Sequence, residues 1–256
     1  MRVDKIDITQ EGIYITAPMN GDYKEHIQAQ IERQVTSGQP RLAHLIVWNL
    51  ERPAAIGSDE PKQYAKDCFE WFYSRLVDEV WVSDPALAKE TQLRYVVLGS
   101  DYGLGELSNE KQYDFTHMSV EIPRRREIYK HFGETQVGQN CWPPERDEVL
   151  KRSKFALNVH QDNHPYCEPL RIALFAAYGL PIISERLVKD YPYVYGNDII
   201  QFAYHDLVEG LKTALNDDYE QWQRRGLRLR DKLCRDLQFG NVVRQAVRES
   251  VGIGWR

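Results

Sequence analysis

The run EPLRIALFAAYGLPIISE at residues 168–185 constrains the fold of this chain more than any other stretch. Its apolar residues cover most of the circumference of a helix, which is tolerated only when the helix packs against a sheet. Gly179 and Pro181 then end that helix, and Ile182 with Ile183 begins a buried strand. The run therefore predicts a helix followed by a strand of an α/β domain.

A second strand pattern, FALNVH at residues 155–160, precedes this helix and is joined to it by a polar loop. Strand, loop, helix and strand make a βαβ unit, whose crossover is almost always right-handed. Ligands of such sheets bind beyond the carboxyl ends of the strands, near helix N-termini. The residues predicted to surround one candidate site are His160, Asp162, Asn163, His164, Glu168 and Arg171.

Strand and helix patterns alternate along most of the chain, which is typical of parallel, doubly wound sheets. Strands are expected at residues 6–8, 13–16, 42–50, 79–83, 94–98, 113–120, 135–139 and 199–203. Helices are expected at residues 23–35, 62–77, from 85 onward, and at 124–132, 144–153, 205–215 and 219–237. A domain boundary is expected between about residues 92 and 112.

The longer run ERDEVLKRSKFALNVHQDNHPYCEPLRIALFAAYGLPIISE, residues 145–185, resembles the nucleotide-binding half of GT-B glycosyltransferases. The likeness is to the glycosyltransferase group 1 and CgeB-like proteins, with their "RSK..LN.H" strand, Glu and Arg at a helix start, and "A..G.P.IS(E/D)". It extends weakly to residues 113–126, YDFTHMSVEIPRRR, and more weakly to residues 48–51 and 80–83.

The resemblance implies an α/β fold of two Rossmann-like domains facing a cleft. Residues 1–100 would form a reduced acceptor-side domain, and residues 101–256 a nucleotide-sugar-binding domain with a terminal helix. The implied activity moves a sugar from a nucleotide-sugar donor to an acceptor hydroxyl, without a metal or another cofactor. One position departs from the pattern: Leu174 stands where many retaining members have a Glu that holds the donor ribose.

Five residues are candidates for donor binding, each with a structural alternative. Arg124 and Arg125 follow a strand and open a helix, so they could meet phosphate or simply be solvated. Glu168 could hold ribose hydroxyls or the free amides of its helix start. Arg171 could pair with Glu168 or reach the diphosphate. His160 could bind the sugar or phosphate, or be a buried histidine with a backbone partner.

Two further residues are predicted with less support from their surroundings. Trp142, beside two prolines, could border the nucleobase or serve packing. An inverting reaction needs a catalytic base from the first domain, and Glu51, after its strongest strand, is favoured over Asp22 and His26. Glu51 could also be an ordinary loop carboxylate, and a retaining reaction needs no such base.

Composition and missing motifs narrow the class of protein. No signal peptide and no apolar run approaching about 18 residues is present, so neither secretion nor a membrane span is expected. Four dispersed cysteines without a CxxC pair indicate reduced thiols in a cytoplasmic protein. The phosphate-loop, dinucleotide, Gly-x-Ser-x-Gly and zinc-protease motifs are absent. A metal site is not expected, because His160, Asp162 and His164 lie in a loop.

The net charge of −5 argues against a broad nucleic-acid-binding surface. Residues 220–250 are locally basic, which indicates a solvated helix face or, as a minority view, a surface for an acidic partner or for DNA. The acceptor therefore stays open among a glycan, a protein, a small molecule and modified DNA. A non-catalytic nucleotide-sugar-binding module is the alternative to an enzyme, favoured by the short first half and by Leu174.

Overall fold

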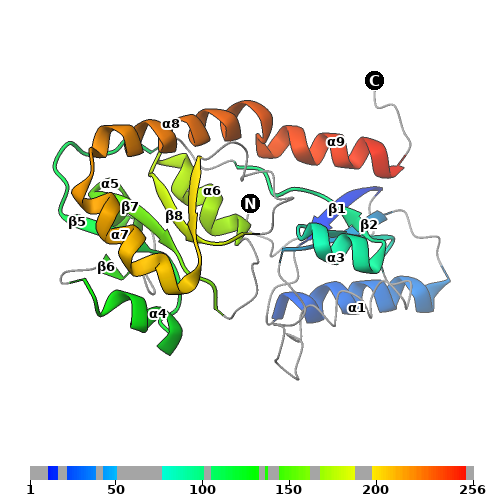
Figure 1. The fold of residues 1–256 in the computed structure, drawn as a ribbon. Helices are drawn as coiled ribbons and strands as arrows, with labels where there is room; N and C mark the ends of the chain where they lie inside the picture. Colours follow the sequence, from blue (N-terminus) through cyan, green and yellow to red (C-terminus); the bar gives the residue numbers. More distant parts are fainter. Residues whose placement is uncertain are drawn as a thin grey trace. The chain divides into compact units, whose positions relative to one another are not determined.

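The computed structural model describes residues 11–16, 22–38, 43–50, 77–100, 105–132, 136–137, 144–161, 168–187 and 198–251. The chain divides into two compact units, Met1–Val96 and Val97–Arg256. Each unit contains one parallel sheet with helices packed on it (Figure 1). The predicted α/β class with two Rossmann-like parts is confirmed.

The first unit holds a four-stranded parallel sheet of order β1-β2-β3-β4. Its described elements are β1 Gly12–Thr16, α1 Asp22–Ser37, β2 Ala43–Asn49, β3 Glu79–Val82, α3 Pro85–Thr91 and β4 Arg94–Tyr95. Leu45 and Val47 pack with Ile31 of α1 and Leu87 of α3, so both helices cover one face of the sheet. The predicted strand at residues 6–8 and nearly all of the predicted helix at 62–77 lie outside the described residues.

The second unit holds a five-stranded parallel sheet of order β6-β5-β7-β8-β9. Its strands are β5 Tyr113–His117, β6 Gln136–Val137, β7 Ser153–Asn158, β8 Ile182–Glu185 and β9 Ile199–Phe202. Its helices are α4 Pro123–Tyr129, α5 Glu145–Lys151, α6 Pro169–Ala177, η2 Tyr204–Asp206, α7 Leu207–Asn216, α8 Tyr219–Asp236 and α9 Phe239–Val251.

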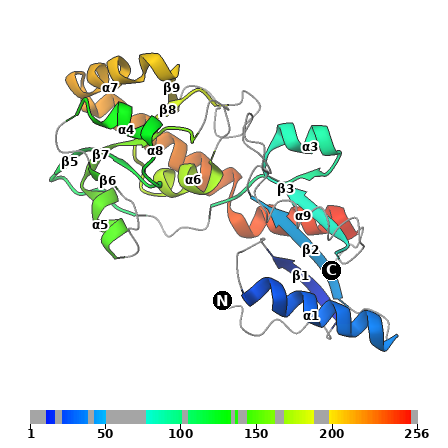
Figure 2. The same cartoon turned by 90° about the horizontal axis from the view of Figure 1, so that it is seen from below.

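Helices cover both faces of this second sheet, as the sequence predicts. Ala156 and Ile182 pack on one face with residues of α5, α6 and α8. Phe155, Leu157 and Ile183 point the other way and pack with α4 and α7. Figures 1 and 2 show α6 and α8 on the side of the sheet opposite α4 and α7. The strands are buried on both faces because each strand alternates between the two cores.

The order of the strands reverses next to β5. From β5 the chain passes through α4 to β6 on one side, and it then returns to place β7 on the other side. The carboxyl ends of β5 and β7 therefore form a topological switch point, where α/β sheets bind ligands. α4 begins just after β5, and α6 follows β7, so their first residues are brought to this point.

The C-terminal helix differs from the prediction. The expected helix at 219–237 is α8, but a second helix, α9, follows after a break at Leu237. There the amide of Ser100 donates to the carbonyl of Leu237 at 2.8 Å, and the amide of Phe239 donates to the carbonyl of Ser100 at 3.1 Å. The helix ends because its backbone pairs with a segment far earlier in the chain. None of the helices among the described residues is long and apolar enough to cross a membrane.

Candidate functional site

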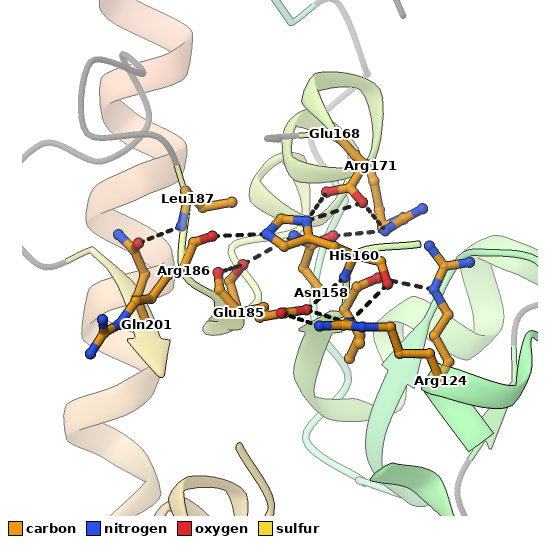
Figure 3. Close-up of polar contacts among 12 residues, drawn as sticks. Arg124, Asn158, His160, Glu168, Arg171, Glu185, Arg186, Leu187 and Gln201 are labelled. Carbon is orange, nitrogen blue, oxygen red and sulfur yellow. Dashed lines mark hydrogen bonds and ion pairs between the residues drawn. The ribbon is translucent and has the colours of Figure 1, made fainter. Parts of the chain in front are cut away.

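The structure brings five of the predicted site residues together at the switch point. Arg124 and Arg125 open α4. His160 follows β7, Glu168 is the N-cap of α6, and Arg171 lies in its first turn (Figure 3). With Glu185, at the end of β8, these residues are called the switch-point site below. The other predicted residues, which lie outside the described residues, are Glu51, Trp142, Asp162, Asn163 and His164.

His160 and Glu168 form a buried pair at the centre of the site. His160 Nδ1 lies 3.3 Å from Glu168 Oε2, and His160 Nε2 lies 2.9 Å from the carbonyl oxygen of Arg186. A carbonyl can only accept, so Nε2 carries a proton, and Nδ1 faces a carboxylate that also prefers a donor. Both ring nitrogens therefore donate when His160 is an imidazolium ion.

The charges of this pair support each other. Burial disfavours the imidazolium, but the hydrogen bond and charge of Glu168 and the Arg186 carbonyl raise the pKa of His160. Burial also opposes ionisation of Glu168, but the charges of Arg171 and His160 hold the pKa of that carboxyl at about 2. Ionised Glu168 and protonated His160 thus stabilise each other.

Glu168 does not cap its helix, which corrects one of the two roles expected for it. It occupies the N-cap position of α6, yet its side chain makes no capping hydrogen bond. The carboxylate instead faces His160 and, at 3.3 Å, Nη1 of Arg171. Its side chain is 19% exposed. Because an ionised carboxylate has about four acceptor positions, it can still accept hydrogen bonds from a ligand.

Arg171 also holds two strand ends. Its Nε donates to the carbonyl of Met118 at 3.0 Å, and its Nη1 donates to Asn158 Oδ1 at 2.7 Å. Arg125 is built in the same way: its Nε donates to the carbonyl of Val159 and its Nη1 to that of Val120. Among the described residues, Nη2 of both arginines has no hydrogen-bond partner.

Arg125 and Arg171 act on each other and on His117. Burial and the positive charge of Arg171 lower the pKa of Arg125. Burial and the charges of Arg125 and Arg171 lower the pKa of His117 to about 3, so this ring is neutral at pH 7. His117 ends β5, stacks on Tyr129 with ring centroids 3.9 Å apart and contacts Ser119 Oγ at 3.0 Å. The two cations therefore lie close enough to repel each other.

Among the described residues, positive charge is in excess at the switch-point site. With His160 protonated, four cationic side chains face two carboxylates. The cations are Arg124, Arg125, His160 and Arg171, and the carboxylates are Glu168 and Glu185. This imbalance, together with two unengaged arginine nitrogens, suits an anion that carries about two negative charges.

The sequence did not single out Glu185, Asn158 and Tyr204 as site residues. Glu185 accepts from Arg124, Asn158 from Arg171, and the Tyr204 hydroxyl donates to the carbonyl of Arg124 at 2.7 Å. Glu185 and Asn158 each end a buried parallel strand with a polar side chain, and that signal could have found both. Tyr204 carries no comparable signal, because it starts a short 3-10 turn.

The basic residues of α8 are largely neutralised by nearby carboxylates. Arg224 lies 3.7 Å from Glu220, Arg228 3.3 Å from Asp198, and Arg235 2.7 Å from Asp236. Lys232 also pairs with Asp198, while the Arg225 guanidinium lies 5.3 Å from the ring centre of Trp222. This arrangement agrees better with a solvated helix face than with a surface for DNA.

Comparison with known proteins identifies the fold. No protein-family model matches the chain. The chain is 27% identical to the uncharacterized protein L140 of Acanthamoeba polyphaga mimivirus over 105 residues. This match covers 39% of the chain and 32% of L140. Among solved structures, TarM has a TM-score of 0.62 at 10% identity and covers 93% of this chain and 54% of TarM.

Two further structures give the same answer. HepE (Alr3699) of Anabaena, in complex with UDP and glucose, has a TM-score of 0.66 at 8% identity. The match covers 90% of this chain and 76% of the HepE chain. A glycosyltransferase from Rickettsia africae ESF-5 has a TM-score of 0.52 at 9% identity, and the match covers 91% of this chain and 84% of the Rickettsia chain. The chain thus has the GT-B glycosyltransferase fold. It spans about a third of its curated relative and just over half of TarM.

Proposed function

We propose that this chain transfers a sugar from a nucleotide-sugar donor to an acceptor hydroxyl, and that the donor binds at the switch-point site. The observation that carries the proposal is the excess of positive charge among the described residues at the ligand-binding edge of a GT-B fold, where Nη2 of Arg125 and of Arg171 has no partner among those residues. The diphosphate of a nucleotide sugar carries about two negative charges and so matches this excess of positive charge. The complexes of HepE with UDP, with UDP-glucose, and with UDP and glucose support this class of donor.

The proposed chemistry needs the departing diphosphate to be stabilised. Arg125 and Arg171 would donate to its oxygens through their Nη2 groups, and they are already fixed by backbone carbonyls. Such preorganised donors stabilise developing charge without reorganisation, which allows a reaction without a metal. Glu168 would accept from ribose hydroxyls in place of the carboxylate that Leu174 replaces. His160 would hold Glu168 ionised and oriented.

The acceptor side of the proposal rests on the first unit. If the reaction inverts configuration, Glu51 is the proposed base, while a retaining reaction would not need one. The acceptor is proposed to be a glycan, a protein or a small molecule, because the charges of α8 are paired.

Cys234 is an exposed free thiol, which agrees with a reducing, cytoplasmic location.

A non-catalytic nucleotide-sugar-binding module is the second candidate. The observation that favours it is Leu174 of α6. This residue is 7% exposed and packs in the core, at the position where a carboxylate would contact the ligand. Such a module would bind the donor at the same arginines but would not turn it over. The two candidates therefore share a binding site and differ in reaction.

Calorimetric titration with UDP-, GDP- and other nucleotide sugars, with donor hydrolysis followed in parallel, separates these possibilities. Turnover of one donor supports the enzyme, whereas tight binding without turnover supports the module. Arg171→Gln should weaken binding by about 10- to 100-fold, since hydrogen bonds to charged groups contribute roughly 1.5–3 kcal/mol.

Arg126→Gln is the matched control for this variant, because Arg126 is 65% exposed and, among the described residues, pairs with Glu121 alone, at 2.7 Å. It should leave affinity unchanged. Failure of every donor to bind the wild-type chain would reject the proposal. Equal effects of the two substitutions would reject the assignment of Arg171.

A further inference from the structure

Glu185 joins three segments of the second unit that are distant in sequence. Its side chain is 9% exposed and pairs with both Nη1 and Nη2 of Arg124, at the start of α4. Its Oε2 also accepts from the backbone amide of His160 at 3.1 Å. One buried carboxylate at the end of β8 therefore fixes the start of α4 and the residue that leaves β7 (Figure 3).

Both terminal nitrogens of Arg124 bond to the protein. Besides Glu185, its Nη1 contacts the carbonyl of His160 at 3.2 Å, and its guanidinium lies 3.8 Å from the ring centre of Tyr204. The Tyr204 hydroxyl in turn donates to the carbonyl of Arg124. Its charge is balanced by Glu185 and its face is covered by an aromatic ring. Nη2 of Arg124 is thus held by a carboxylate, whereas Nη2 of Arg125 and of Arg171 has no hydrogen-bond partner among the described residues.

The backbone of His160 is held on both sides by this arrangement. Glu185 binds its amide, and Arg124 binds its carbonyl. The imidazole is consequently aimed between Glu168 and the carbonyl of Arg186. A small displacement of this backbone would separate His160 from Glu168 and change how Glu168 faces Arg171.

We propose that Glu185 is a positioning residue, which sets donor affinity through Arg124 and the backbone of His160 without touching the donor. This inference rests on the proposed function and changes the role of Arg124 from donor contact to support. Among the described residues, the charges that act on the His160 ring are those of Glu168, before α6, and Glu185 on β8. Arg171 pairs with Glu168, and Arg124 pairs with Glu185. Together, Glu185, Arg124 and Tyr204 are called the clamp.

Glu185→Gln tests the clamp, because it keeps the shape of the side chain and removes its charge. UDP binding should weaken roughly 10- to 100-fold, the effect typical of residues that orient a ligand-binding group. With a donor that is turned over, KM should rise more than kcat falls. Arg124→Lys, which keeps the charge but loses the paired geometry, should act in the same direction. The double variant should be little worse than either single one, since both remove the same contact.

A second readout is independent of nucleotide. In histidine-labelled protein, the ring signal absent from His160→Gln identifies His160, and its pH titration is followed by NMR. Glu185→Gln should lower the pKa of His160, because a nearby negative charge is lost and the ring is less well placed. Glu121→Gln is the control, since Arg126 is the one ion-pair partner of Glu121 within the described part of the chain. It should change neither readout.

The two readouts separate failure of the clamp from failure of the proposed function. If no nucleotide binds the wild-type chain but Glu185→Gln still lowers the pKa of His160, the function fails and the clamp stands. Unchanged titration of His160 and unchanged UDP affinity in Glu185→Gln would overturn the clamp. If Glu185→Gln does not fold, Tyr204→Phe removes a single hydroxyl and should shift both readouts less, in the same direction. No shift in that variant would count as a negative result for the clamp.

Discussion

Single residues couple the switch-point site to pH through the pair of His160 and Glu168. The pKa of Glu168 is lowered from 4.5 to about 2, so its ionisation stabilises the fold above pH 4.5, and this contribution is lost as pH falls toward 2. The pKa of His160 is raised from 6.5, so its protonation stabilises the fold below that pH and is lost as pH rises through the raised value. The pair should therefore contribute most between pH 4.5 and 6.5.

Glu168→Gln should lower the free energy of unfolding by roughly 3 kcal/mol at most in that window, the ceiling set by the shift in the pKa of Glu168. The difference from the wild type should shrink on both sides of the window. Urea denaturation at steps from pH 3 to pH 8 measures it. Glu209→Gln, on the exposed surface of α7, should show no such profile. A difference that does not change with pH would contradict the charged pair.

At the scale of elements, α8 packs at Gly226 against the backbone that joins α6 to β8, with no room for a side chain. A Cβ at this position would lie 2.2 Å from the carbonyl oxygen of Gly179 and 2.6 Å from the carbonyl carbon of Leu180. Both are backbone atoms, so the clash cannot be relieved by a rotamer change. Gly226→Ala should destabilise the protein by about 1–3 kcal/mol through overpacking, despite a gain in helix propensity of about 1 kcal/mol.

Gly240→Ala is the matched comparison, since a Cβ there meets only the Gln238 side chain, at 3.8 Å. It should be neutral or stabilising by up to about 1 kcal/mol. Thermal denaturation of both variants measures the two effects. Equal stability of Gly226→Ala and the wild type would show that α8 packs less tightly against the segment that follows α6.

The elements could be predicted where their signals are local. The apolar helix, Gly179 at φ +68° and the following strand all follow from residues 168–185 alone. The close contact of Gly226 with the backbone after α6 and the break at Leu237 could not be predicted, because each depends on backbone far away in the sequence. Likewise, the sequence predicts that side chains at the ends of the strands lie close together. It does not predict which of them bond to each other, because that depends on strand register. Asn158 pairs with Ser184, which sets Glu185 beside His160.

For the whole molecule, charge distribution bears on the class of acceptor. The net charge is −5, and most basic residues of α8 have a carboxylate within 4 Å. A DNA-binding surface needs basic groups that can exchange counterions for phosphates. Arg228 is a poor choice for testing this, because it pairs with Asp198, whose side chain is 2% exposed. Removing Arg228 would leave a buried carboxylate short of a partner and disturb the fold.

Arg224→Gln combined with Arg225→Gln tests DNA binding without touching Asp198. We expect the wild type to bind duplex DNA no better than about 10⁻⁴ M at physiological salt, the weak end of non-specific binding. The double variant should then be indistinguishable from it. Fluorescence anisotropy over a series of salt concentrations measures both proteins. If DNA were the acceptor, binding would be tight at low salt. The log–log salt slope would then be smaller by about 1.8 in the double variant, since each phosphate contact contributes roughly 0.9. That outcome would make DNA the preferred acceptor and assign its contact surface to the first half of α8.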